Sequence, residues 1–209
     1  MALALAGVLY NSWVLELALP TGIDPRHAYV SELYAAGQPF RALFGTVEVL
    51  CAVLVGVGAW RTRTLAAGSR AEAAGWWALV AFAAWSVADV AVPMGCAPSV
   101  DVGCRAVHPW HTVTSALVHF SLFASMGLLI VAARTGREGL RPVRRWGPWL
   151  LAGALVSALC TVGALLGLPG WHGAAQRVHL LLVGVWLTLL AGSGRDRPGR
   201  ALRAGEPAG

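Results

Sequence analysis

Ionisable side chains occupy matching depths in five separate apolar stretches of this chain. At about 1.5 Å per helical residue, each lies roughly 7 to 12 Å from the same end of its stretch. The residues are Glu16, Glu48, Asp89, His119 and His179. An acidic side chain at such a depth in a bilayer costs at least ~2.5 kcal/mol, so it usually faces the bundle interior and marks a site or pathway. We therefore expect one shared polar cavity at this level.

Helical spacing strengthens this expectation for two of the stretches. His111, Ser115 and His119 fall within about an 80° arc of one helix, while His172, Gln176 and His179 follow at positions i, i+4 and i+7 of another. Each helix would then turn a polar stripe inward. Polar groups at these depths also serve as glue between helices, so any single residue can be purely structural.

Two kinds of chemistry fit these residues. In an enzyme, Glu48 or Asp89 would act as a base, Ser31 and Glu32 would complete the catalytic set, and the cofactor would be a zinc ion that activates water for lipid hydrolysis. The predicted zinc ligands are His111, His119 and His179. An acid site acting on an isoprenoid is a further option for the same cavity.

In a carrier or sensor, the same layer would bind a proton or a small hydrophobic or amphiphilic ligand, with Glu48 and Asp89 as proton acceptors. The predicted ligand-binding residues are Gln176, Arg177 and Trp85. Trp13, Trp85 and Trp186 lie deep enough to wall an apolar or cation-stabilising pocket, although plain packing also explains them.

Two further segments lie at the same end of the chain's apolar stretches. The segment GIDPRHAYVSELYAAGQPF has Tyr29, Val30, Leu33 and Tyr34 at helical spacing, which predicts a short interfacial helix over the bundle. The segment GCAPSVDVGCRAVHP contains Cys96 and Cys104, which predict a disulfide in an oxidising compartment. A zinc knuckle that includes a nearby histidine is the alternative.

The elements that position these residues are predicted to be membrane-spanning helices. Of 209 residues, 57% are hydrophobic and 12% are charged, which is typical of an all-α polytopic bundle. Six stretches match the roughly 20 residues that cross a bilayer. They are residues 2–20, 42–60, 74–94, 110–133, 148–168 and 177–194, followed by a basic tail, 195–209, predicted to be disordered.

Arginine predicts the orientation, since the chain has no lysine. Twelve of its sixteen arginines lie between spans two and three, between spans four and five, or in the tail. The positive-inside rule then places both termini in the cytoplasm. The net charge of +6 requires no nucleic-acid partner, because these arginines can contact anionic lipid headgroups.

Several of these motifs resemble the DUF998 family of bacterial and archaeal integral membrane proteins. The resemblance rests on NSWVLELALPTGIDP, SELYAAGQPF, CAPSVDVGC, HTVTSALVH and GAAQRVHLLLVGVW. It implies a six-helix protein of a bacterial plasma membrane but supplies no reaction. Positions that it marks as recurrent are Ser31, Glu32, Leu33, Asp89, the two loop cysteines, His111, Gln176 and Arg177.

Overall fold

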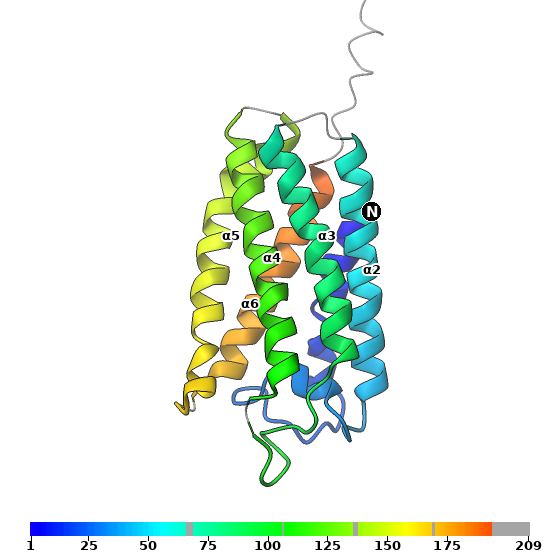
Figure 1. Cartoon of the computed structure of the whole chain (residues 1–209), viewed down its shortest axis with the longest axis vertical. Coiled ribbons are helices and arrows are strands. Elements are labelled where there is room, and N and C mark those ends of the chain that lie inside the picture. The colour runs from blue at the N-terminus through cyan, green and yellow to red at the C-terminus, as the bar shows by residue number, and fades with distance from the viewer. Residues whose placement is uncertain (66–68, 106, 136–137, 169, 194–209) are drawn as a thin grey trace, which may run out of the picture.

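The computed structural model describes residues 1–65, 69–105, 107–135, 138–168 and 170–193, and this part of the chain is helical without strands. Five long helices run side by side (Figure 1). Their bounds are α2 Arg41–Leu65, α3 Arg70–Ala91, α4 Pro109–Ala133, α5 Arg141–Leu159 and α6 His172–Gly192. With its flanking 3-10 turns, α5 belongs to one apolar span, Glu138–Ala164. Within the described residues, five helices are therefore long and apolar enough to cross a membrane.

The first apolar stretch is shorter than the others. It consists of α1 (Ala2–Leu9) followed by a 3-10 segment, η1 (Ser12–Leu17). Between them the side-chain amide of Asn11 donates to the carbonyl of Gly7 at 3.1 Å, and the Trp13 indole N–H donates to the Asn11 side-chain oxygen. Together, Ala2–Leu17 form a sixth apolar element, so the structure fits a six-helix membrane bundle.

Close contact between α1 and α6 explains the glycines where the two helices meet. A Cβ atom on Gly7 would lie 2.5 Å from both the carbonyl oxygen of Gly184 and the hydroxyl of Thr188. A Cβ atom on Gly184 would in turn overlap the side chain of Asn11. The backbones approach to this distance because neither glycine has a side chain, as is common between membrane helices.

The two ends of the bundle differ in character. One end, here the disulfide end, has residues 18–40, 92–105 and 160–168, and η2 (Val30–Tyr34) lies there (Figure 1). The opposite end, here the arginine end, has the last residues of α2 and α4 and the first residues of α3 and α5. There the guanidinium of Arg63 lies 4.1 Å from the Trp60 ring and 4.3 Å from the Trp77 ring. This stacking lets α2 continue past its predicted end at residue 60.

Local signals explain several helix starts. The hydroxyl of Ser69 accepts the backbone N–H of Glu72 at 3.2 Å and thereby caps α3. Pro109 occupies the first turn of α4, where its missing N–H costs nothing. The helices α5 and α6 begin at Arg141 and His172, before the predicted spans at residues 148 and 177, because polar residues there continue the helix beyond the apolar segment. The predicted tail, 195–209, lies outside the described residues.

A layer of buried apolar side chains fills the middle of the bundle. Its residues are 0–1% exposed and come from α3, α4 and α6: Leu79, Phe82, Met126, Leu129, Val183 and Leu187. We call this layer the apolar plug. On each helix, the plug lies between the arginine end and the polar residues that the sequence predicts to share a cavity.

Candidate functional site

A cavity of about 470 Å³ lies in the half of the bundle nearest the disulfide end. Its walls come from η1, η2, the helices α2 to α4, the end of α5, η4 and the start of α6. Six of the predicted site residues line it: Ser31, Glu48, Asp89, His111, His119 and Gln176. Segments far apart in the sequence therefore meet around one space.

Asp89 is the most densely hydrogen-bonded side chain of the cavity. One carboxylate oxygen accepts the hydroxyls of Thr114 at 2.6 Å and Ser115 at 2.8 Å, and the other accepts the Tyr34 hydroxyl at 3.1 Å. Burial first, and the nearby charge of Asp89 second, raise the pKa of the Tyr34 hydroxyl well above its ordinary value. Tyr34 therefore remains a hydrogen-bond donor to Asp89.

His111 lies against Asp89, with its Nδ1 atom 3.3 Å from the carboxylate. The same nitrogen lies 3.2 Å from the backbone carbonyl of Val92. Both neighbours are acceptors, so Nδ1 carries the proton, and Nε2 of the neutral ring is an acceptor. A carboxylate that fixes a histidine tautomer in this way is the arrangement that general-base catalysis needs.

His119 and His179 stack on each other, with ring centroids 5.0 Å apart. In each ring Nδ1 lies near a backbone carbonyl, that of Ser115 at 2.7 Å for His119 and that of Ala154 at 2.9 Å for His179. His119 lines the cavity, whereas His179 is 1% exposed and does not. The Nε2 atom of His179 has no hydrogen-bond partner among the described residues.

Glu48 and Ser86 contribute the polar atoms of the cavity that are not engaged by the protein. Glu48 makes no hydrogen bond or ion pair with any described residue, although it lies within the long helix α2. The hydroxyl of Ser86 is buried and also lacks a partner within the described part of the chain. Such unmatched groups beside a cavity are suited to contacting a ligand or water.

Arg177 is a predicted ligand-binding residue, but its guanidinium makes hydrogen bonds to other residues of the protein. Its guanidinium makes two parallel hydrogen bonds to Glu16, at 2.5 and 2.6 Å. The remaining donor group contacts the carbonyls of Pro25, Ala28 and Gly173. Arg177 and Glu16 are 6% exposed, and neither lines the cavity. The structure thus assigns this pair to joining η1, the first loop and α6.

The other residues of the first loop divide between the cavity and the scaffold. The carboxylate of Glu32 accepts the backbone N–H groups of Tyr29 and Ser99, each at 2.9 Å, so Glu32 ties the first loop to the disulfide loop. Gln176 accepts the backbone N–H of Val30 at 2.6 Å. Ser31 lines the cavity, and its hydroxyl lies 3.4 Å from the sulfur of Met94.

Of the tryptophans predicted to wall a pocket, only Trp13 lines the cavity. Trp186 is fully buried in the core, and Trp85 is 37% exposed on α3. Among the hydroxyl groups that the sequence reasoning missed are those of Tyr10 and Ser86, which line the cavity, and that of Thr114, which donates to Asp89. A signal existed for Thr114, since it adjoins Ser115, but hydroxyl residues are common in apolar helices and do not identify a site by themselves.

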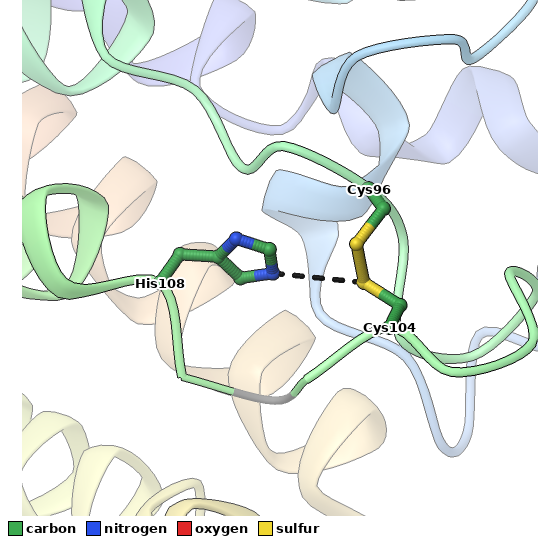
Figure 2. A group of neighbouring side chains, drawn as sticks. All are labelled: Cys96, Cys104 and His108. Carbon is green, nitrogen blue, oxygen red and sulfur yellow. Dashed lines mark hydrogen bonds between the residues drawn. A yellow bond between two sulfur atoms is a disulfide. The ribbon is translucent and has the colours of Figure 1, made fainter.

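The disulfide end contains the remaining candidate metal ligands. Within the described residues, Cys96, Cys104 and His108 are the one set of three or more potential ligands whose ligand atoms lie within 4.8 Å of one another. The two cysteines are joined in a disulfide with Cα atoms 6.0 Å apart, and His108 Nε2 lies 3.7 Å from the Cys104 sulfur (Figure 2). Disulfide sulfurs are not thiolates, so this set could hold a metal only after reduction.

The three predicted zinc ligands behave differently. His119 and His179 are neighbours. In the described part of the chain, however, the ring nitrogens of His111, His119 and His179 do not lie within 4.8 Å of one another as a set of three. His111 instead contacts Asp89. The geometry therefore supplies an acid–base pair and a histidine stack, and the zinc centre stays a prediction.

Comparison with known proteins places the chain in a family. No curated protein and no solved structure matches it. Residues 3–193 match the family described as protein of unknown function (DUF998), which covers nearly the whole chain. The resemblance carried by the motifs of the loops and the last helix is thereby confirmed, and the protein belongs to the DUF998 family.

Proposed function

We propose that this protein binds a small amphiphile, taken up from the bilayer, in the cavity at the disulfide end. The observation that carries the proposal is the composition of the cavity wall. Apolar and aromatic side chains make up most of it, and polar groups, among them Asp89 and Glu48, make up the rest. A site of this size and composition is typical of small-molecule binding.

The position of the cavity supports entry from the side of the bundle. Ala116 of α4 and Leu155 and Leu159 of α5 line the cavity and are also exposed on the surface of these helices. The apolar plug occupies the bundle core between the cavity and the arginine end. A ligand would therefore enter between α4 and α5 rather than pass through the bundle.

Cavity filling tests this function. Ala158 of α5 lines the cavity, whereas Ala152 on the same helix is exposed and does not. We expect detergent-purified wild-type protein to bind the neutral amphiphile monooleoylglycerol, measured by native mass spectrometry. Ala158→Phe should weaken this binding at least about tenfold, and Ala152→Phe should not. Equal binding by both variants would overturn the proposal, and so would wild-type protein that binds neither this neutral amphiphile nor a charged one.

The contact between Asp89 and His111 favours a second candidate, a hydrolase acting on a lipid ester. Asp89 would hold the His111 tautomer, and His111 Nε2 would accept a proton from the attacking water. Wild-type protein in liposomes should then release oleate from monooleoylglycerol, and His111→Gln should slow the release about 100-fold or more. Binding without release by wild type would leave the carrier or sensor as the function.

We further propose a plasma-membrane location with both termini in the cytoplasm. The described arginines Arg61, Arg70, Arg134 and Arg141 lie at the arginine end, and the disulfide lies at the opposite end. Positive charge favours the cytoplasmic side, and a disulfide persists in an oxidising compartment. The two features support the same orientation independently.

A further inference from the structure

We infer that the ligand of the cavity is an organic cation with apolar or aromatic substituents. This inference rests on the proposed binding function and adds the charge of the ligand to it. It follows from three features of the cavity wall, which are its acidic groups, its lack of arginine among the described residues and its aromatic rings.

The charged groups that line the cavity are acidic. Glu48 and Asp89 line it, and among the described residues no arginine does. Arg177, the nearest candidate, is held by Glu16 and by backbone carbonyls. The Nδ1 atom of His108 accepts the backbone N–H of Gly95 at 3.2 Å, so it is not a hydrogen-bond donor to the cavity.

The wall leaves this negative charge incompletely balanced. Asp89 accepts hydrogen bonds from three hydroxyl groups, which carry no charge. A positive charge on His111 would balance the charge of Asp89 but not that of Glu48. Glu48 makes no hydrogen bond and no ion pair with any residue in the described part of the chain. Two carboxyl groups that share a cavity repel each other when both are ionised. A bound cation relieves this repulsion.

A second, independent feature indicates that the acidic wall faces a ligand. The hydroxyl of Ser86 lines the cavity, is 3% exposed and has no partner among the described residues. Ser86 lies one helical turn before Asp89 on α3, so an unpaired hydroxyl and a carboxylate are presented side by side. Both groups can accept hydrogen bonds from, or lie against, a positively charged head group.

Aromatic rings complete the wall. They belong to Tyr10, Trp13, Tyr29, Tyr34 and Phe123. A cation near the face of such rings is attracted by their electron density, and the rings also accept apolar substituents. Acidic and aromatic groups in one desolvated space therefore suit a lipophilic cation better than a neutral lipid or an anion.

A matched pair of ions tests the inference. Tetraphenylphosphonium and tetraphenylborate share one shape and carry opposite charges. We expect the cation to bind the detergent-purified full chain saturably, at least about tenfold more tightly than the anion, in equilibrium dialysis. Asp89→Asn and Glu48→Gln should each weaken binding of the cation at least about tenfold. Glu138→Gln, which removes an exposed charge at the arginine end, should leave it unchanged.

Each outcome bears on the inference. If thermal unfolding shows that Asp89→Asn is not folded, binding of the cation by Glu48→Gln tests the inference instead. Equal binding of the two ions, or cation binding that neither acidic variant changes, overturns the inference. If the protein binds monooleoylglycerol but not tetraphenylphosphonium, the inference about the charge of the ligand is wrong and the proposed binding function stands. Binding of neither probe overturns the proposed function as well.

Discussion

Arg177 and Glu16 form a buried ion pair that supports the fold and takes no part in the cavity. Both charges are buried, and the guanidinium and carboxylate satisfy each other through two hydrogen bonds, with backbone carbonyls taking the remaining donor group. Asp89 is buried as well, but its partners include Tyr34, Ser115 and His111, which line the cavity. The partners of a buried charge therefore decide whether that charge is available to a ligand.

Replacing Arg177 by glutamine should destabilise the protein by about 3–5 kcal/mol, because Glu16 would remain as an unpaired buried charge. Thermal and denaturant unfolding in detergent would measure the change. The double variant with Glu16→Gln should lose less stability than the sum of the two single variants. Arg26→Gln is the control, because its partner Asp24 is exposed and the pair lies outside the cavity. A neutral effect of Arg177→Gln would contradict the assignment.

The phenol of Tyr29 should titrate with a pKa of about 12, because burial and, secondarily, the charge of Glu32 disfavour its ionised form. Its hydroxyl donates to the carbonyl of Thr161 at 2.7 Å. The stability that Tyr29 contributes is present below the unfolded pKa of 10.0 and is lost as pH rises through about 12. The difference in ultraviolet phenolate titration between wild type and Tyr29→Phe would show this midpoint. A midpoint near 10 would mean that the ring is solvated.

At the scale of elements, the first loop is held against the start of α6. Arg177 bonds the carbonyls of Pro25 and Ala28, and Gln176 accepts the backbone N–H of Val30. The loop can approach this closely because α6 has a glycine, Gly173, at the contact. The same contact places η2, and with it Ser31 and Tyr34, over the cavity.

Gly173→Ala should therefore disturb the first loop. Its Cβ atom would overlap the carbonyl oxygen of Ala28 and lie 2.6 Å from that of Pro25. Since backbone atoms cannot rotate away, we expect a loss of about 1–3 kcal/mol in unfolding free energy and weaker ligand binding. Gly192→Ala is the matched control on α6, where nothing lies within 4 Å of the added atom, and should change stability by less than about 0.5 kcal/mol. Equal stability of the two variants would refute the close contact.

The whole molecule is polarised along the bundle. The cavity, the disulfide and the first loop share one end, and most of the described arginines lie at the other. The apolar plug lies between them. A ligand bound in the cavity would therefore be accessible from the disulfide end or from the adjoining bilayer.

Single cysteines would test the proposed orientation. In a Cys160→Ala background, Trp171→Cys places a thiol at an exposed position of the disulfide end, and Glu138→Cys places one at an exposed position of the arginine end. A membrane-impermeant maleimide added to intact cells should label Trp171→Cys alone. Glu138→Cys should react only after the membrane is permeabilised. The reverse pattern would invert the topology.

The sequence by itself determined the bundle and the level of its polar layer, because apolar length and the energetic cost of buried charge are local properties. Tertiary structure decided what each polar residue contacts. Arg177 and Asp89 both occur in apolar helices of the sequence, yet one pairs with Glu16 and the other lines the cavity with His111. Likewise, Trp85 is exposed on α3 while Trp13 lines the cavity. These outcomes depend on how each helix is rotated and on where the first loop docks, which packing between distant segments sets.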